Sequence, residues 1–455
     1  MTTVADAAVP VSHARRVRLR VEDLPAWPFA LPFVAYPAAW LLGIGDVVWV
    51  IAGAVVVLVL LRTDGVRVPR GFGVWLMFLA WSTASFFQLD SGGRLLGFGY
   101  RQALYLSATA LAVYAYNARR SVTDAVVGRV LTYFLGVMTA GGLLALAQPL
   151  LTFRTPLSYV VPASLQSNEL IGEMVVRRTT QWNPDAWVVL EPRPSAPFLY
   201  TNTWGNVYSI VLPFVLLHLV RRWHSRSRPW LLALVATSVV VAVLTLNRGM
   251  FVGLGVVVAW LGLQALRAGR LRQLAAGLVL LAAAVPAWLA SSASASLFDR
   301  VETSSSTTDR AALYVETWDR TLESPLFGYG APRPASVPWL PSVGTQGQLW
   351  TVLFSHGVVG LGLFLAWFVV VVVRSWRRAD VLGAVATGVV LATIVESVFY
   401  GMMTGLNVSL LASVLALRPP SEPEGGPDPA ASVAGDAVRG GPSGARQPVM
   451  AGGAS

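Results

Sequence analysis

Arg248 lies in the tripeptide Asn247-Arg248-Gly249, which is the polar break between two apolar runs, 229 to 246 and 249 to 266. Charge beside hydrocarbon is costly, so an Arg here either reaches to the membrane surface from a Gly turn or binds an anion. A guanidinium donates paired hydrogen bonds that match a phosphate, and the point charge of a Lys does not reproduce them. Arg248 is therefore a candidate for binding a phosphate presented by a lipid headgroup.

Arg310 is a second candidate, because it stands near the start of the segment TTDRAALYVETWDRTLESP. In a helix, Arg310, Tyr314 and Trp318 fall at i, i+4 and i+8 and share one face, which suits the membrane interface. The alternative interpretation is a surface pair of Arg310 with Asp309 or Tyr314, which contributes little.

Arg193 is a third candidate, in the segment EPRPSAPFLYTNTWGNVYSIVLPF that leads back into an apolar run. Its prolines stiffen the chain before this run begins. Asn202 and Trp204, at the start of the run, are candidates for contacting a substrate. Polar residues at a helix start can also act as caps alone, and this alternative stays open.

Composition indicates the environment in which these side chains act. Hydrophobic residues make up 55% of the 455 residues and charged residues only 13%, and the mean hydropathy is +0.60. A soluble globular protein of this length would not normally show this balance. The chain has no Cys, which excludes disulfides and thiolate metal sites. Its net charge of +11 comes from arginines spread between apolar runs, so a soluble nucleic-acid-binding protein is not expected.

Apolar runs long enough to span a bilayer, which needs roughly 20 residues in a helix, recur along most of the chain. Twelve such runs are found, near 27 to 44, 46 to 62, 71 to 88, 98 to 116, 124 to 150, 204 to 220, 229 to 246, 249 to 266, 273 to 290, 346 to 373, 380 to 399 and 402 to 417. The sequence therefore predicts an all-α, polytopic integral membrane protein with about twelve transmembrane helices.

Arginine clusters on every second connection between these runs, as the positive-inside rule requires. The clusters are Arg15 to Arg20, Arg62 to Arg70, Arg119 and Arg120, Arg221 to Arg228, Arg267 to Arg272, and Arg374 to Arg378. This alternation predicts that both termini are cytoplasmic. The expected parts are a cytoplasmic segment (1–26), a transmembrane domain (27–417), and a cytoplasmic tail (418–455) that is too rich in Pro, Gly, Ala and Ser to fold.

Two long connections, 151–203 and 291–345, fall on the outer side, and loops of this length are usually functional. Within the second, a helix is expected after an N-cap at Thr307 or Thr308, ending at Ser324-Pro325. Gly328 and Gly330 in SPLFGYGAPRP predict a turn, since no strand precedes them as a nucleotide-binding loop requires.

Groups that could accept a proton are few on the outer side. Neither long loop contains a His, and His356 lies about ten residues into a span, roughly 15 Å from the outer boundary if the helix is straight. Glu396 lies within a span near its outer end, where a carboxylate is a functional candidate or pairs with an Arg. The candidate bases are carboxylates: Glu302, Asp309, Glu316, Asp319 and Glu396.

The order of these features resembles the O-antigen ligase and polymerase superfamily, bacterial polytopic enzymes that move glycans from a polyprenyl pyrophosphate carrier to an acceptor on the outer face. The matching pieces are RPSAPFLYTNTWGN, the TLNRG break at Arg248, TTDRAALYVETWDRTLESPLFGYG, and VGTQGQLWTVLFSHGVVGLGLFL. They define a ligase-like region over 193–365. The earlier helices match by count and by loop placement.

The resemblance implies a multi-pass protein of the bacterial inner membrane and a glycan transfer that uses neither a metal nor another cofactor. An acceptor hydroxyl attacks the anomeric carbon, and the lipid pyrophosphate leaves. Arg248 and Arg310 match the family's outer-face arginines, and such cations would stabilise the growing negative charge of the leaving group. Many members carry a His-Asn pair where the last large loop meets the membrane, but this chain reads Thr345-Gln346-Gly347. Gln346 is accordingly a substrate-binding candidate, and the departure favours a divergent or specialised member.

The function expected from the sequence is a ligase or polymerase of surface polysaccharides, with a lipid-linked glycan, a glycan or lipid acceptor and membrane lipids as its partners. Two alternatives stay open. A transporter or flippase of lipid-linked saccharides would place its polar residues at mid-membrane and show repeat symmetry. A non-catalytic partner of the glycan assembly machinery is the other alternative, because Gln346 cannot accept a proton as His does.

Overall fold

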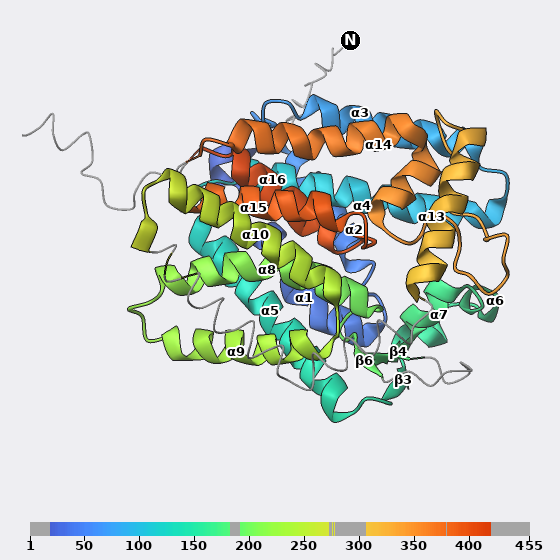
Figure 1. Ribbon diagram of the computed structural model, residues 1–455, viewed down its shortest axis with the longest axis horizontal. Helices are drawn as coiled ribbons and strands as arrows, with labels where there is room; N and C mark the ends of the chain where they lie inside the picture. Colours follow the sequence, from blue (N-terminus) through green and yellow to red (C-terminus); the bar gives the residue numbers. More distant parts are fainter. Residues whose placement is uncertain are drawn as a thin grey trace, which may run out of the picture. The chain divides into compact units, whose positions relative to one another are not determined.

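A computed structural model describes residues 19–182, 192–272, 275, 277, 306–378 and 380–419. This part of the chain is mostly helical (Figure 1). The longer helices are α1 (Trp27–Leu42), α2 (Val48–Leu61), α3 (Gly73–Ala84), α4 (Gly92–Asn117), α5 (Asp124–Ala147), α8 (Thr201–Arg221), α9 (Arg228–Leu244), α10 (Arg248–Arg267), α13 (Ser306–Glu323), α14 (Gln348–Ser375), α15 (Val381–Glu396) and α16 (Gly405–Leu417).

The remaining elements are short. They are the helices α6 (Ala163–Gln166) and α7 (Glu169–Val175), the 3-10 turns η1 (Val21–Asp23), η2 (Ser85–Gln88) and η3 (Pro156–Tyr159), and the strands β1 (Leu19–Arg20), β2 (Thr63–Asp64), β3 (Thr152–Arg154), β4 (Val176–Arg178), β5 (Thr180–Gln181) and β6 (Arg193–Pro194). Each strand pairs with one other: β1 with β2 in parallel, β3 with β4 and β5 with β6 antiparallel. The last two pairs lie within the described parts of the loop 151–203, residues 151–182 and 192–203.

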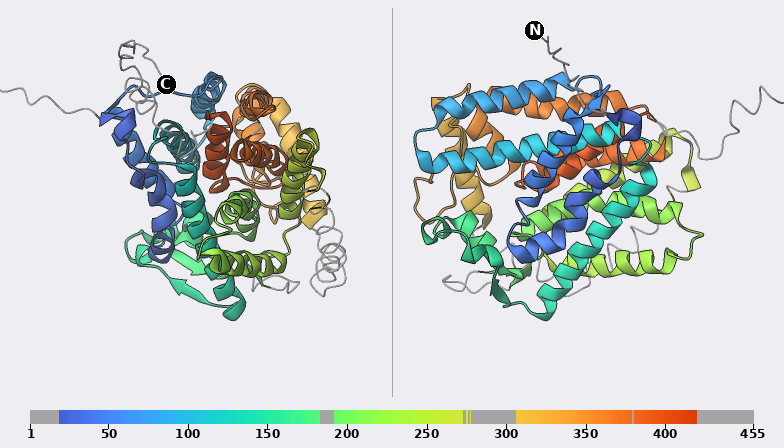
Figure 2. Two further views of the ribbon diagram at one scale, coloured as in Figure 1. Left: turned by 90° about the vertical axis from the view of Figure 1, so that its left-hand side faces the viewer. Right: turned by 180° about the vertical axis from the view of Figure 1, so that it is seen from behind.

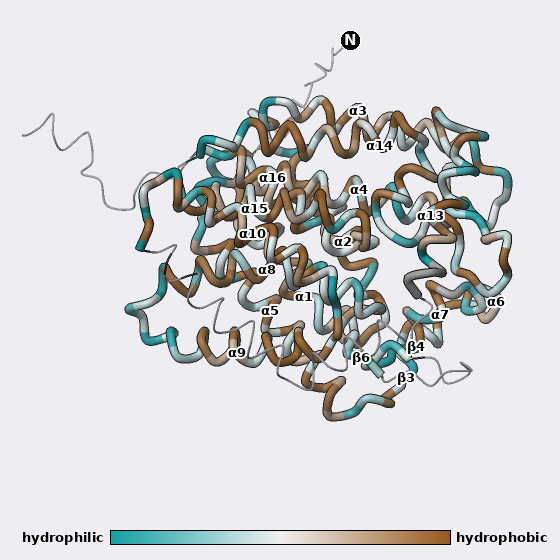
Figure 3. Tube along the Cα trace, viewed as in Figure 1, coloured by the Kyte–Doolittle hydropathy of each residue, from teal (hydrophilic) through white to brown (hydrophobic). Residues whose placement is uncertain are grey.

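Within the described residues, four helices are long and apolar enough to cross a membrane: α5, α8, α10 and α14. Four shorter apolar helices accompany them: α2, α9, α15 and α16. Figure 3 shows hydrophobic residues along the helices and hydrophilic ones mainly at their ends and in the connections. Large apolar side chains are exposed on the outward faces, among them Leu58, Leu61, Trp230 and Val240. Exposed apolar surface of this extent is expected where a protein meets lipid.

The centre of the bundle is formed by α15 and α16. Helix α15 packs against α8, α10, α14 and α16, and α16 packs also against α4. Both helices are apolar all round and buried on nearly every side, which explains how they remain stable at 16 and 13 residues. Helices α3 and α14 lie side by side at one flank (Figure 1), and Figure 2 shows the bundle from two further sides.

The connections gather at two ends of the bundle. The C-terminal ends of α8, α10 and α14, which lead into Arg-rich connections, lie at the left in Figure 1. Helices α7 and α13 and the strands β3, β4 and β6 lie at the opposite end. The two ends of α10 are about 30 Å apart at 1.5 Å per residue, close to the thickness of the hydrocarbon layer.

Helices occupy eleven of the twelve runs that the sequence predicts, and the run 273–290 falls almost entirely outside the described residues. The helix expected near 307–323 is confirmed, but it already includes Ser306, the first described residue there, so Thr307 and Thr308 lie inside the helix and the expected N-cap is wrong. The turn at Gly328 and Gly330 is confirmed, since both have positive φ.

The expected start of the C-terminal tail at Arg418 is also wrong. Arg418 is 4% exposed, and its guanidinium donates to the carbonyl oxygens of Ala115 and Val122 at 3.4 and 2.9 Å. Asp124 lies 3.6 Å from the same group. A buried cation needs such partners, so Arg418 belongs to the helical bundle. Residues 420–455 fall outside the described part of the chain.

Candidate functional site

Tyr400, in the connection between α15 and α16, is the centre of the candidate site. Its side chain is 2% exposed, and its hydroxyl donates to Asn247 Oδ1. A Cβ atom at Gly249 would lie 2.6 Å from the Tyr400 hydroxyl oxygen, so only glycine fits there. Tyr400 therefore packs directly on the first turn of α10.

Asn247 joins this turn to the start of α8. Its Nδ2 donates to the carbonyl oxygen of Thr201 at 3.0 Å, and a Cβ atom at Gly205 would lie 2.1 Å from the same nitrogen. Both polar ends of the buried amide are thus satisfied, one by Tyr400 and one by Thr201. Arg248, the next residue, begins α10 at a position that these contacts determine.

Arg310 reaches the site from α13. On the same helix, the Tyr314 ring stacks on Trp350 of α14, with ring centroids 4.3 Å apart. The Tyr314 hydroxyl donates to the carbonyl oxygen of Val398 at 3.4 Å. Burial raises the pKa of Tyr314, and the Arg310 charge acts against this rise. The expected helix face therefore packs against protein at Tyr314, whereas Trp318 is exposed.

Arg193 reaches the site from β6. Its backbone pairs with Gln181 of β5, and the Thr201 hydroxyl donates to its carbonyl oxygen at 3.4 Å. The first residue of α8 thus contacts both Arg193 and Asn247. These contacts hold the chain at Arg193 against the starts of α8 and α10.

The charges of Arg310 and Arg193 converge on one hydroxyl. Burial and the neighbouring Glu396 raise the pKa of Tyr400 well above its ordinary value, and both arginines act in the opposite direction. Two guanidinium groups from different loops are therefore within electrostatic reach of Tyr400. Within the part of the chain that the structure describes, neither Arg248 nor Arg310 has a carboxylate partner. The absence of a carboxylate partner at Arg248 and Arg310, within these described residues, favours an anionic ligand.

The other predicted site residues lie differently. Gln346 is half-buried beside α13, and its carbonyl oxygen accepts from the Tyr314 hydroxyl at 3.5 Å. Asn202 is half-buried in the first turn of α8. Trp204 is fully buried, stacks on Tyr208 and donates to the carbonyl oxygen of Met138 at 3.3 Å. The structure therefore corrects the prediction for Trp204, since its side chain packs in the core and presents no surface to a ligand.

Glu396 has an amide partner in place of the expected Arg. Its Oε2 accepts from Asn206 Nδ2 at 2.6 Å, and the carboxyl group is completely buried. A Cβ atom at Gly253 would lie 1.6 Å from Glu396 Oε1, so this glycine makes the room for the carboxyl group. Sequence reasoning placed Glu396 near the outer end of its span but gave no signal for Asn206, Asn247 or Tyr400 beyond their polarity next to apolar runs.

Helix α14 is broken at Gly357, whose φ is 70°. The loop after α13 fills the break: the Tyr329 and Gly330 amides donate to the carbonyl oxygens of Phe354 and Ser355 at 2.9 and 2.8 Å, and the Val358 amide donates to Pro325 at 2.8 Å. Every break in a helix frees backbone groups that need new partners in a membrane. The loop supplies them, so α13 is held in place by α14.

His356 immediately precedes this break and is 1% exposed. Its Nδ1 shares a hydrogen bond of 2.6 Å with the Ser85 hydroxyl. The depth of roughly 15 Å expected for His356 was calculated for a straight helix. Because α14 is broken at Gly357, this depth no longer follows from the number of residues. The imidazole packs beside Phe78 and Tyr105, with ring centroids 6.2 Å apart in both contacts.

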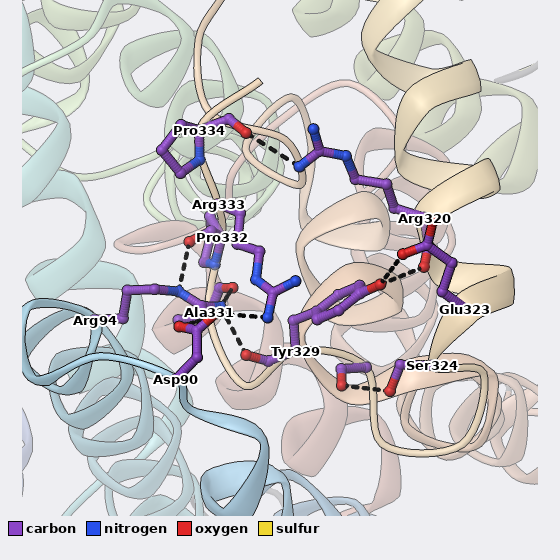
Figure 4. A network of polar contacts seen from close by, with 11 residues as sticks. Asp90, Arg94, Arg320, Glu323, Ser324, Tyr329, Ala331, Pro332, Arg333 and Pro334 are labelled. Atoms are coloured by element: carbon purple, nitrogen blue, oxygen red, sulfur yellow. Dashed lines mark hydrogen bonds and ion pairs between the residues drawn. The ribbon is translucent and has the colours of Figure 1, made fainter. Parts of the chain in front are cut away.

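A polar network joins the same loop to α4 (Figure 4). Arg94 donates to the carbonyl oxygens of Tyr329 and Pro332 and pairs with Asp90. Arg333 pairs with Asp90 at 2.6 Å and lies over the Tyr329 ring. The hydrogen bond from Arg94 lowers the pKa of Asp90. These contacts stiffen the loop that supports α13.

A comparison with models of known protein families gives no match, and a comparison with curated proteins gives none either. Among the described residues, no group of three or more His, Cys, Asp and Glu side chains is placed to hold a metal ion.

Proposed function

We propose that this protein transfers a saccharide from a polyprenyl pyrophosphate carrier to an acceptor hydroxyl at the outer face of a bacterial cytoplasmic membrane. The observation that carries the proposal is the contact of Tyr400 with Asn247 and with Gly249, on either side of Arg248 at the start of α10. The charges of Arg310 and Arg193 are near enough to Tyr400 to oppose the rise in its pKa. The helices α5, α8, α10 and α14, each able to cross a membrane, support it. In this proposal the chain spans the membrane about twelve times, with both termini in the cytoplasm.

The start of α10 adds to the attraction for a phosphate. The first amide groups of a helix have no partners inside the helix, and its dipole places positive potential at this end. The Asn247 side chain does not cap these amides, because its hydrogen bonds go to Tyr400 and Thr201. A pyrophosphate placed here would meet Arg248 and the first turn of α10, with Arg310 and Arg193 supplied by the two loops.

The reaction requires one bond to form and one to break. The acceptor oxygen forms a bond to the anomeric carbon, the bond from this carbon to the phosphate oxygen breaks, and the electron pair leaves with the pyrophosphate. The acceptor proton passes to a base or to water. Cations fixed before the reaction stabilise the growing charge on the leaving group, and this is the role proposed for the three arginines. Asn247 and Tyr400 are positioning residues for Arg248.

The first experiment measures the affinity of the purified full-length protein for polyprenyl pyrophosphate, which leaves in every reaction of this kind. Arg248→Ala and Arg310→Ala each remove a charged hydrogen-bond donor, so the affinity is expected to fall roughly 10- to 100-fold. Arg248→Lys is expected to restore little, because an ammonium does not bind a phosphate bidentately.

Arg154→Ala is the matched control, because Arg154 is an exposed arginine of β3 in the loop 151–203. It removes the same charge without touching Tyr400 or Asn247 and should keep wild-type affinity. A second measurement follows transfer from lipid-linked glycans extracted from cells that lack the protein. Full affinity and full transfer in both Arg248→Ala and Arg310→Ala would contradict the proposal.

One observation favours the transport alternative. The Asn206–Glu396 pair is buried among α8, α10 and α15, and intramembrane carboxylates often mark transport pathways. Transport requires two compartments, whereas transfer also proceeds in detergent. A glycosylated acceptor formed by the detergent-solubilised protein supports transfer; movement of lipid-linked glycan across vesicles without any product supports transport, and neither activity supports a non-catalytic partner.

A further inference from the structure

A second arginine cluster lies at the other end of α10 from Arg248. A pocket of about 640 Å³ opens there between the last turns of α10 and the connection from α14 to α15. Its polar lining consists of Gln264, Arg267, Arg270, Trp376, Arg377 and Arg378. Four guanidinium groups thus surround one space that the proposed transfer reaction does not use.

These arginines differ in how they are held. Arg378 donates to Asp380 Oδ1 at 2.6 Å and to the carbonyl oxygens of Leu415 and Ala416 at 3.1 and 2.9 Å, so its direction is set by protein contacts. The guanidinium of Arg267 lies over the Trp376 ring, 4.7 Å from its centroid. Both side chains are therefore ordered before any ligand binds.

The other two arginines are available to a ligand. Arg270 and Arg377 are exposed, and within the described residues neither has a hydrogen bond or an ion pair from its guanidinium. Asp380 is the one carboxylate that pairs with an arginine of this pocket in that part of the chain. The local charge is strongly positive, and an anion would neutralise it.

The position and the apolar lining identify the source of this anion. Leu261, Ala384 and Val381 line the same pocket beside the arginines. The pocket lies about 30 Å along α10 from Arg248, the distance that separates the two surfaces of the hydrocarbon layer. Trp376 packs against Trp260, and aromatic rings at this depth are typical of the interface. A free phosphate would use the arginines only, whereas a lipid would use both parts of the lining.

We propose that this pocket binds the phosphate headgroup of one anionic phospholipid. The phosphate oxygens accept hydrogen bonds from Arg270 and Arg377, and Arg267 and Arg378 add charge from the walls. The first part of the acyl chains lies along Leu261 and Val381. A pocket of this volume is within the usual range for sites that hold a small molecule.

The experiment uses native mass spectrometry of the full-length protein in detergent, titrated with phosphatidylglycerol, with phosphatidylcholine or with inorganic phosphate. The wild-type protein is expected to bind one phosphatidylglycerol with preference over phosphatidylcholine. The double variant Arg270→Gln/Arg377→Gln is expected to bind it roughly 10- to 30-fold more weakly, since each arginine near a lipid surface contributes about 1 kcal/mol. Thermal unfolding with and without the lipid provides a second readout.

Arg222→Gln/Arg226→Gln is the matched control, because it removes two exposed arginines from the connection between α8 and α9. It should retain wild-type lipid affinity. Equal weakening in both double variants would mean that overall charge attracts the lipid, and unchanged affinity in Arg270→Gln/Arg377→Gln would mean that the pocket does not bind it. Inorganic phosphate that stabilises the protein as much as phosphatidylglycerol would show a free-anion site. Each of these three results overturns the proposal.

Discussion

The side chain of Tyr400 has two roles in the site, one in packing and one in hydrogen bonding. Its ring fills the space over Gly249, and its hydroxyl satisfies a buried amide oxygen of Asn247. Arg310 and Arg193 both act on this hydroxyl, so a change at Tyr400 alters the packing and the electrostatics of the site together. The two effects can be separated by experiment.

Tyr400→Phe keeps the ring and removes the hydroxyl. The Asn247 amide oxygen then stays buried without a donor, which should cost about 1–3 kcal/mol of unfolding free energy. Because Asn247 precedes Arg248, the affinity for polyprenyl pyrophosphate is also expected to fall, on the order of tenfold. Thermal unfolding of the purified variant measures the first effect, and its affinity for polyprenyl pyrophosphate measures the second.

Tyr208→Phe is the matched control at the residue scale. Tyr208 is equally buried, and its hydroxyl bonds to Ser238 at 3.2 Å, within the helices α8 and α9. This variant should be less stable to unfolding and should keep the wild-type affinity for polyprenyl pyrophosphate. If Tyr208→Phe weakened the binding of polyprenyl pyrophosphate as much as Tyr400→Phe, the proposed role of Tyr400 in positioning Arg248 would be wrong.

At the scale of elements, the interface between α10 and α15 decides how closely the site is assembled. Gly249 and Gly253 lie one turn apart on α10, and they contact Tyr400 and Glu396, which also lie four residues apart. The absence of side chains at both glycines lets the two segments approach. The Asn206–Glu396 hydrogen bond then ties α8 into the same interface.

Gly253→Ala is expected to destabilise the protein, although alanine favours a helix. The new Cβ atom would lie 1.6 Å from Glu396 Oε1, so the helices must separate or the carboxyl group must move. Overpacking of this kind is expected to lower the free energy of unfolding by about 1–3 kcal/mol. The unfolding temperature in detergent should decrease accordingly.

Gly255→Ala is the control for this change, since it lies on the same helix and a Cβ atom there meets nothing within 4 Å. Here the gain in helix propensity is expected to dominate, by roughly 0.5–1 kcal/mol. A Gly253→Ala protein as stable as Gly255→Ala would show that α10 and α15 do not pack as closely as described.

At the scale of the whole molecule, the two ends of the bundle differ in their residues. Arg-rich connections follow α8, α10 and α14 at one end, and the strands β3, β4 and β6 and helix α13 lie at the other. On the positive-inside rule, we propose that the Arg-rich end faces the cytoplasm. The proposed function depends on this orientation, because the carrier would be used at the outer face.

The absence of cysteine allows a direct test of orientation. Single substitutions Tyr159→Cys, in the loop 151–203, and Arg226→Cys, between α8 and α9, place thiols at exposed positions. A membrane-impermeant maleimide applied to intact spheroplasts should label Cys at position 159 and should label position 226 only after permeabilisation. The wild-type chain is the unlabelled control, and the reverse pattern would invert the topology.

The sequence by itself determined the helical segments, because a run of apolar residues can satisfy its backbone in a membrane only as a helix. Eleven runs coincide with helices, the end of α13 at Glu323 followed from the Ser324-Pro325 stop signal, and the turn at Gly328 followed from its glycines. It also identified Arg193, Arg248 and Arg310 as candidates, because charge beside apolar runs is costly and therefore conspicuous. All of these predictions depend only on residues that are close together in the sequence.

The tertiary structure alone decided which candidates meet. Arg193 and Arg310 act on Tyr400, and Trp204 turns into the core, although all lie in polar or aromatic segments beside helix starts. The contact of Tyr400 with Asn247 joins residues 153 positions apart, and the break at Gly357 is filled by a loop that precedes it. Hydropathy and spacing describe one helix at a time. The partners of a buried polar group depend on how several helices pack, and this information is not local in the sequence.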